Sequence, residues 1–277
     1  MILVTAATAP VGRSIVEQLA AAGVAVRALT RKPEEAGLPA AAQVVAGDLG
    51  DRQSLGAAMI GIDAVFLLAA TPGFAPAFLD AAKAAGVRRI VFQSSSAIVD
   101  GADPQPDDVA AFHVDIERQI VSSGLEWTFL RLEVASSDAL QWAFDVPGQL
   151  ATGDVVRGPY ADAQVSPIHP GDFAAVAVAA LTDDTHAGAV YRVAGPYSMT
   201  LREQVQRIGV AHGRDLAYQE LDADAARAAM SPYAPADLLM ATWARHRTEP
   251  APVDDLIERV TGRPPRSLQE WVAAYPI

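Results

Sequence analysis

The sequence predicts an α/β protein built on a doubly wound, mostly parallel sheet, with a smaller, mainly helical C-terminal capping region. Over the first 130 residues, short apolar runs rich in β-branched residues alternate with longer segments of helical period. The apolar runs are nearly continuous, as is typical of strands in a parallel sheet covered on both faces. This rhythm breaks after residue 132. We therefore expect residues 1–132 to form the core and residues 133–277 the cap, interleaved with the last elements of the sheet.

Six strands are expected in the first part of the chain. The apolar runs that predict them are Ile2–Thr5, Val24–Leu29, Gln43–Ala46, Ala64–Leu68, Arg89–Gln93 and Trp127–Arg131. The intervening segments have helical period, and most end at a glycine, which commonly stops a helix. They are Val11–Ala22, a short helix from about Arg52, Ala75–Ala85 and Val109–Ser122. This alternation indicates repeated strand–helix–strand units.

The second part of the chain has a different pattern. Pro147–Asp162 is rich in Gly, Pro and Asp, which favours loops or hairpins. Asp172 is expected to cap the N-terminus of a helix that runs to Leu181. Val190–Val193 predicts a further strand, and the chain from Thr200 on is mostly helical and dense in proline.

The composition excludes several classes of function. The net charge is −12, from 33 acidic and 21 basic residues, so nucleic acid is not an expected partner. Cysteine is absent, which excludes thiol chemistry and cysteine-held metals and suits a reducing cytoplasm. No His and carboxylate spacing indicates a metal site. No apolar run reaches the ~18 residues of a membrane span, and the N-terminus lacks a signal peptide's basic region. We expect a cytoplasmic monomer or homodimer.

The first strand leads directly into a turn that opens a helix, Thr5-Ala6-Ala7-Thr8-Ala9-Pro10-Val11-Gly12. This is the setting of a dinucleotide-binding turn, where a pyrophosphate meets the N-terminus of a helix. Glycines normally stand at the positions of Ala6, Ala9 and Gly12, for the tight turn, for close approach of the phosphates and for helix–strand packing. Only Gly12 is retained. The alternative interpretation is an ordinary strand–loop–helix turn.

Basic residues follow the second strand. NAD-binding proteins usually place an acid there, whereas Arg31 and Lys32 suit the 2′-phosphate of NADP(H). Arg13, near the helix start, is a further candidate for this phosphate, and Asp48 and Leu49 are expected to flank the adenine. Residues at the ends of the fourth and fifth strands complete the predicted cofactor site, namely Ala69, Ala70, Thr71 and Ser94. The alternative for Arg31 and Lys32 is a solvated pair of loop charges.

Several stretches together resemble the NmrA-like branch of the atypical short-chain dehydrogenase/reductases. They are Ile2-Leu3-Val4-Thr5 with Gly12-Arg13, Val26–Arg31, Gly47-Asp48-Leu49, Ser122–Arg131, Ile168–Ala174 and Thr261–Ser267. The resemblance covers nearly the whole chain and implies an NAD(P)-binding Rossmann fold. The family includes NADPH-dependent reductases of quinones and ketones, and regulators that bind the dinucleotide without turning it over.

The proton donor of such a reductase has to be unusual. The Tyr-x-x-x-Lys motif of typical family members is absent, because neither Lys32 nor Lys83 has a tyrosine four positions before it. One candidate is Ser95, within the Ser94–Ser96 run after the fifth strand. Its alternative role is to cap its own loop backbone.

A second candidate donor is His113, since histidine titrates near neutrality. Glu117 lies one helical turn later on the same face, where it is expected to orient the imidazole or raise its pKa. By resemblance, His113 falls near a lysine that serves the active site of isoflavone-reductase-like enzymes. A half-exposed structural histidine is the alternative. His169 is a third candidate, with packing as its alternative role.

The leading hypothesis is an NADPH-dependent reductase of a small apolar carbonyl compound, either a quinone or an aromatic polyketide-type ketone. Aromatic residues of the cap would stack on this flat substrate, with Trp142, Phe144, Tyr160 and Tyr197 as candidates. Two alternatives remain open. One is a non-catalytic NADP-binding redox sensor with a protein partner. The other is a cyclase, lyase or binding protein that keeps the fold and has lost the cofactor.

Overall fold

The computed structural model describes residues 1–69, 72–137 and 139–273. The chain divides into two compact units. The first unit is formed by Met1–Arg131, Pro170–Arg192 and Ile257–Arg263. The second is formed by Leu132–His169, Val193–Leu256 and the segment from Pro264 on.

The first unit is built around a seven-stranded sheet of order β3-β2-β1-β4-β5-β6-β9. The strands are β1 (Ile2–Val4), β2 (Val26–Thr30), β3 (Gln43–Ala46), β4 (Ala64–Leu67), β5 (Arg89–Ser95), β6 (Glu126–Leu132) and β9 (Val190–Val193). The pairings from β3 through β5 are all parallel. The predicted doubly wound fold is thus confirmed, and the strand order reverses between β1 and β4.

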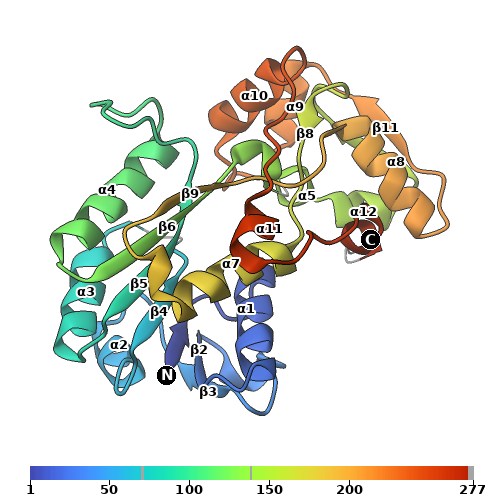
Figure 1. Ribbon diagram of the computed structural model, residues 1–277. Coiled ribbons are helices and arrows are strands. Elements are labelled where there is room, and N and C mark those ends of the chain that lie inside the picture. The colour runs from blue at the N-terminus through green and yellow to red at the C-terminus, as the bar shows by residue number, and fades with distance from the viewer. Residues whose placement is uncertain (70–71, 138, 274–277) are drawn as a thin grey trace. The chain divides into compact units, whose positions relative to one another are not determined.

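Helices cover both faces of this sheet (Figure 1). On one face α1 (Pro10–Ala21) packs against α7 (Pro170–Thr182), and on the other α3 (Ala75–Ala84) packs against both α2 (Arg52–Ala58) and α4 (Asp108–Ser122). Apolar strand residues such as Leu3, Val65 and Phe92 are fully buried between the layers, which explains their nearly continuous apolar runs. Among the described residues, no helix has the length and apolar character needed to cross a membrane.

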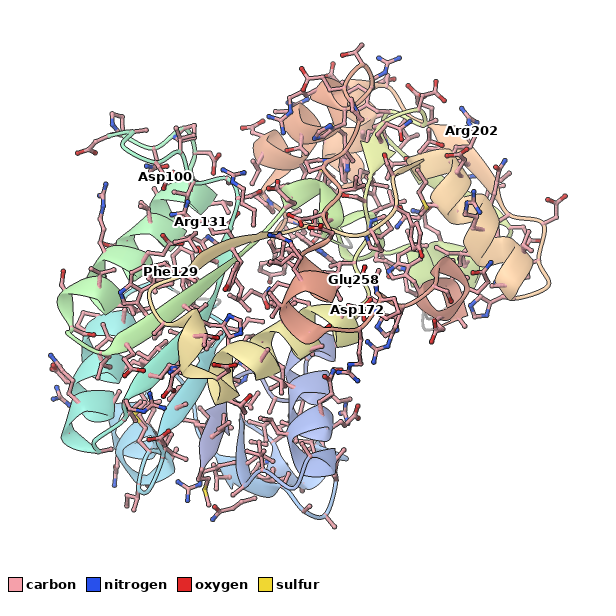
Figure 2. The ribbon with its side chains drawn as sticks, viewed as in Figure 1. Asp100, Phe129, Arg131, Asp172, Arg202 and Glu258 are labelled. Atoms are coloured by element: carbon pink, nitrogen blue, oxygen red, sulfur yellow. The ribbon has the colours of Figure 1, made fainter. Side chains whose placement is uncertain are left out.

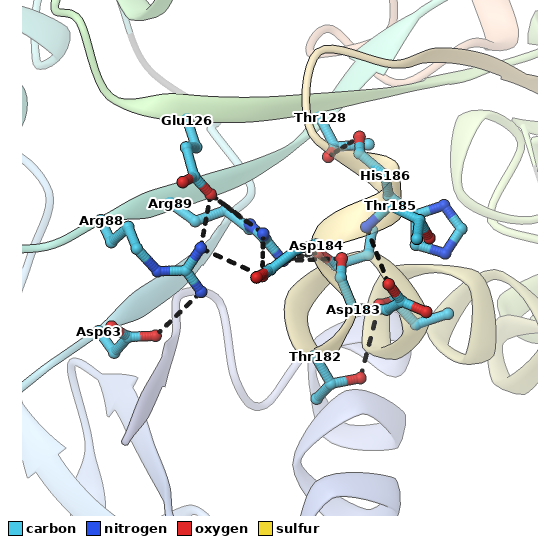
Figure 3. A network of polar contacts seen from close by, with 12 residues as sticks. Asp63, Arg88, Arg89, Glu126, Thr128, Thr182, Asp183, Asp184, Thr185 and His186 are labelled. Carbon is cyan, nitrogen blue, oxygen red and sulfur yellow. Dashed lines mark hydrogen bonds and ion pairs between the residues drawn. The ribbon is translucent and has the colours of Figure 1, made fainter.

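A charged network closes the amino end of β5 (Figure 3). Arg89, the first residue of β5, is completely buried and donates hydrogen bonds to the carbonyl oxygens of Ala180 and Asp183. These are among the last carbonyls at the C-terminal end of α7, which lack partners within the helix. The Arg89 guanidinium also pairs with Glu126 and Asp184. The network therefore anchors α7 on the sheet, at the edge opposite the carboxyl ends of the strands.

The second unit combines helices with two small two-stranded sheets, β10-β8 and β11-β7. Its strands are β7 (Val155–Gly158), β8 (Gln164–Val165), β10 (Met199–Thr200) and β11 (Ala217–Glu220). Its helices are α5 (Ala139–Ala143), α6 (Val146–Leu150), α8 (Leu201–Ala211), α9 (Ala223–Ala229), α10 (Ala236–Arg245) and α12 (Leu268–Ala273), while most of α11 (Leu256–Thr261) belongs to the first unit. One hydrophobic cluster that includes Phe144, Trp243 and Trp271 forms its core.

Two sequence-based expectations about this region were wrong. Pro147–Asp162 was expected to form loops or hairpins, but it contains most of α6 and all of β7. Proline is accepted in the first turn of a helix, and β7 pairs in parallel with the distant β11. Asp172 is not an N-cap, because α7 already begins at Pro170 and Asp172 is buried within its first turn.

Candidate active site

A cavity of about 320 Å³ opens where the strand order reverses. Its lining comes from the carboxyl ends of β1, β2, β3 and β4, which is where open α/β sheets bind ligands. The lining residues are Thr5, Ala6, Thr8, Ala9, Leu29, Thr30, Arg31, Gly47, Asp48, Leu49 and Leu68. All of them belong to the first unit.

Six of the predicted cofactor residues line this cavity, namely Thr5, Thr8, Ala9, Arg31, Asp48 and Leu49. Others lie outside its lining, namely Ala7, Pro10, Val11, Gly12, Lys32, Ala69 and Ser94. Ala70 and Thr71 lie outside the described residues. Our prediction missed Leu29, Thr30, Gly47 and Leu68. Each stands at or next to the end of a predicted strand, and this position could have indicated that it lines the site.

The turn after β1 has the backbone geometry of a dinucleotide-binding turn in spite of its alanines. Ala6 has a φ of +48°, in the left-handed region that favours glycine. A Cβ added at Gly12 would clash with the carbonyl group of Ala6, so α1 approaches β1 as closely as the motif requires. The tight turn and the close helix packing are therefore both present, and the site fits a dinucleotide.

Ala6 carries the strain of this turn, and we expect Ala6→Gly to stabilise the protein. The backbone keeps its left-handed conformation in this variant, and removal of the Cβ relieves about 1–2 kcal/mol of steric strain. The greater backbone freedom of glycine in the unfolded chain offsets about 0.5–1 kcal/mol of this. Denaturant unfolding should show a higher midpoint for Ala6→Gly and a lower one for Ala7→Gly, which removes a buried methyl. A lower midpoint for Ala6→Gly would mean that its methyl group stabilises the fold.

Ala9 differs from Ala6, because its conformation suits any residue. It is the N-cap of α1, with φ −71° and ψ 156°, and it lines the cavity. Its methyl group therefore opposes only the close approach of phosphates to the first N–H groups of α1, which lack partners within the helix. We expect Ala9→Gly to tighten NADPH binding in a titration of the folded protein. An unchanged Kd would show that the phosphates do not pass close to this residue.

The three predicted phosphate-binding cations have different surroundings. Arg31 is exposed at the cavity, and its guanidinium forms no hydrogen bond or ion pair with any described residue. Lys32 pairs with Glu35 at 3.0 Å. Arg13 donates hydrogen bonds to the carbonyl oxygens of Ala36 and Gly37. The expectation that Arg13 faces the phosphate is thus not supported, since its guanidinium anchors the loop after β2.

His113 lies on α4 with its ring against Phe92 and Phe112. Its Nδ1 is 2.8 Å from the carbonyl oxygen of Val109. A carbonyl only accepts hydrogen bonds, so Nδ1 carries a proton and Nε2 is the atom that titrates. Burial lowers the pKa of His113 below its ordinary value of 6.5, and the Val109 carbonyl and Glu117 oppose this shift only in part.

One of the two roles expected for Glu117 was wrong. Its carboxylate does not hold the His113 imidazole, because it accepts hydrogen bonds from Ser94 and Arg131 instead. Its charge does raise the pKa of His113, as expected, but desolvation by burial has the larger effect and the net shift is downward. The partner that sequence reasoning missed is Arg131, which stands on β6, where helical spacing gives no signal.

Ser95 is the last residue of β5 and is nearly buried. Its Oγ accepts a hydrogen bond from the backbone N–H of Ala97, and its own hydroxyl proton has no acceptor among the described residues. Ser94 points toward α4, and neighbouring strand residues point to opposite faces. Ser95 and His113 are therefore separate candidates for a proton donor. The side-chain oxygen of Gln93, also on β5, is buried without a hydrogen-bond partner.

Two other histidines, His186 and His246, have rings that contact groups close to them in the chain. The His186 ring packs against Tyr191, with Nδ1 2.8 Å from the tyrosine hydroxyl. His246 is buried at the C-terminal end of α10, with Nδ1 3.2 Å from the carbonyl oxygen of Glu249. Across the three described stretches, no three His, Asp or Glu side chains gather closely enough to hold a metal ion.

Comparison with known proteins decides the family. Residues 6–184 match the model of a family described as NAD(P)H-binding. The chain belongs to this family. Solved structures of the atypical short-chain dehydrogenase/reductase group share its fold over nearly the whole chain, so the resemblance to the NmrA-like branch is confirmed. All but one of the residues that line the cavity at the carboxyl ends of β1–β4 lie within this match.

Named reductases are similar along the full length of the chain. A (4-alkanoyl-5-oxo-2,5-dihydrofuran-3-yl)methyl phosphate reductase from Streptomyces griseus is 41% identical over 283 residues, which cover 99% of this chain and 98% of the relative. An NAD(P)H azoreductase from Xenophilus azovorans is 31% identical, with coverage of 99% and 98%. The structure of an NADPH-dependent quinone oxidoreductase from Escherichia coli with NADPH is 26% identical, with a TM-score of 0.73 and 99% coverage of both chains. The chain is therefore an NAD(P)H-dependent oxidoreductase.

Proposed function

We propose that this oxidoreductase uses NADPH to reduce a small apolar carbonyl compound, a quinone or an aromatic ketone. The observation that carries the cofactor preference is Arg31, a cation that lines the cavity after β2, pairs with none of the described residues and stands in the position that suits a 2′-phosphate. The substrate class is supported by the relatives, one of which is named for a quinone and another for a ring that bears carbonyl groups.

The reaction needs a hydride and a proton. NADPH, when bound, would supply the hydride, which is two electrons with one hydrogen nucleus, to the electrophilic carbon or oxygen of the acceptor. The proton then neutralises the oxygen, so that a ketone gives an alcohol and a quinone gives a hydroquinone. The protein's task is to hold the acceptor beside the cofactor and to place a proton donor at that oxygen.

Two side chains are proposed as the donor, His113 on α4 and Ser95 at the carboxyl end of β5. His113 would donate from Nε2, the nitrogen left free when Nδ1 is bound to the Val109 carbonyl. Ser95 has a hydroxyl proton free to hydrogen-bond the developing oxyanion. We favour His113, because an imidazolium releases a proton far more readily than a serine hydroxyl.

The second unit is proposed to hold the substrate. Two of its aromatic residues present rings at the surface, since Trp142 is 48% and Tyr197 is 41% exposed. Phe144 and Tyr160 are less available than expected, because Phe144 packs against Trp243 in the core and the Arg247 guanidinium covers the Tyr160 ring. Trp142 and Tyr197 therefore remain candidates for stacking on a flat substrate.

The substrate class is tested by following NADPH oxidation with a panel of naphthoquinones, aromatic ketones, alkanoyl-furanones and azo dyes. The proposal predicts turnover with quinones or ketones and a higher kcat/KM with NADPH than with NADH. Turnover of furanones or azo dyes alone would assign a different substrate. Binding of NADPH without turnover of any acceptor would instead favour the redox-sensor alternative.

A further inference from the structure

Strand β5 has an arginine–glutamate network at each end. At the amino end only Arg89 is buried, because the side chains of Glu126 and Asp184 are 40% and 78% exposed. The network of Arg89, Glu126 and Asp184 closes its amino end (Figure 3). At its carboxyl end, Ser94 donates a 2.6 Å hydrogen bond to Glu117 on α4, and Glu117 is paired with Arg131 on β6. Only the second network adjoins Ser95 in the chain and includes a residue of α4, the helix that carries His113.

The carboxyl-end network is nearly closed to solvent. Ser94, Glu117 and Arg131 are 3%, 5% and 5% exposed. Arg131 holds both carboxylate oxygens of Glu117, at 2.9 Å through Nε and 2.7 Å through Nη2. Such a two-point contact fixes the orientation of both groups. Glu117 and Arg131 also line a cavity of about 360 Å³ beside α4. Side-chain packing therefore surrounds the pair only in part.

Arg131 is anchored by a second carboxylate. Its Nη1 donates to Asp100, in the loop that follows β5, at 2.9 Å, and Figure 2 shows the two side chains turned toward each other. The hydrogen bond to Glu117 is the main reason that the pKa of Arg131 is raised. Arg131 thus stays charged. The pair of Glu117 on α4 and Arg131 on β6 is linked to the end of β5 through Ser94 and to the loop after β5 through Asp100.

We infer that Glu117, held by Arg131, is a positioning residue that sets where β5 ends and how α4 lies against it. Ser95 follows Ser94 directly, and His113 stands one helical turn before Glu117, so both proposed donors depend on this one carboxylate. A buried ion pair is a costly way to gain stability alone. Because this pair lies beside both proposed donors, we assign it the further role of positioning them. This inference rests on the proposed function.

The test compares Glu117→Gln with the matched control Glu126→Gln, which weakens the network at the other end of the same strand. Both variants are expected to melt at a lower temperature. Below melting, Glu117→Gln should lower kcat with a naphthoquinone by roughly ten- to hundred-fold, the effect of a small misplacement of reacting groups. Its Kd for NADPH should not change. Glu126→Gln should keep the wild-type kcat.

Two further measurements separate positioning from stability. Arg131→Lys keeps the charge but loses the two-point contact, so its kcat should fall between those of the wild type and Glu117→Gln. The NMR titration of His113 should shift to lower pH in Glu117→Gln and remain unchanged in Glu126→Gln. The other groups that face the imidazole are Val109, Asp107, Phe92 and Phe112, and neither variant changes them.

A wild type that reduces no acceptor would refute the proposed function only. The titration would then still show whether Glu117 affects His113. Equal losses of kcat in Glu117→Gln and Glu126→Gln, or an unchanged His113 titration in Glu117→Gln, would overturn the inference. Either result would show that the carboxyl-end network contributes to stability alone.

Discussion

Replacement of His113 by alanine is expected to lower kcat by at least tenfold, and general-acid catalysis is typically worth about 10²–10⁴-fold. The reason is geometric: Nδ1 is bound to the Val109 carbonyl, so Nε2 is left to donate a proton. The Kd for NADPH should stay the same, because His113 is not part of the cavity at β1–β4. Steady-state rates and a separate NADPH titration measure the two effects.

The pH dependence provides a second check on His113. Burial lowers its pKa below 6.5, so the imidazolium forms only below that pH and turnover should rise as the pH falls toward the lowered pKa. Stability should change in the opposite direction: below pH 6.5 the unfolded chain takes up the proton first, and folding stability falls. Both trends should be lost in His113→Ala and retained in His186→Ala, whose ring contacts Tyr191 instead. Normal turnover in His113→Ala would assign the proton to Ser95 or water.

Replacement of Arg31 by alanine is expected to weaken NADPH binding roughly ten- to hundred-fold and to leave NADH binding unchanged. One charge-assisted contact to a phosphate is worth ~1.5–3 kcal/mol. Arg31 lines the cavity, and no described residue competes for its guanidinium. Calorimetric titration of both cofactors into wild type and variant gives the comparison directly.

Lys32→Ala is the matched control for this experiment. Lys32 is adjacent in the chain but already pairs with the exposed Glu35, so its loss should change the Kd for NADPH much less. Equal weakening of NADPH and NADH by Arg31→Ala would show that Arg31 does not contact the 2′-phosphate. A larger loss in Lys32→Ala than in Arg31→Ala would assign that phosphate to Lys32.

The fold was predictable because strands that are buried on both faces of the sheet have nearly continuous apolar sequences. Gln43–Ala46 and Val190–Val193 form strands with the bounds we expected, and α1 ends within a residue of its expected end. The prediction failed where a distant partner decides the structure. The pairing of β7 with β11 joins segments about sixty residues apart, and no local pattern records it.

The candidate site was predictable to the extent that position along a strand determines it. Thr8, Arg31 and Asp48 follow strand ends, and the topology brings strand ends together at one edge of the sheet. The contacts of charged side chains were not predictable in the same way. Glu117 has the helical spacing to contact His113, yet Arg131, which offers two donors, takes its carboxylate.

We propose that this chain transfers the hydride of NADPH to a carbonyl acceptor. The most direct measurement uses NADPH that carries deuterium at the hydride position of the nicotinamide, with an aromatic ketone that the enzyme reduces. We expect a C–D bond in the alcohol product, one deuterium for each NADPH oxidised, and a slower rate than with unlabelled NADPH. An alcohol without deuterium, or NADPH that binds and is never oxidised by any acceptor of the panel, would contradict it.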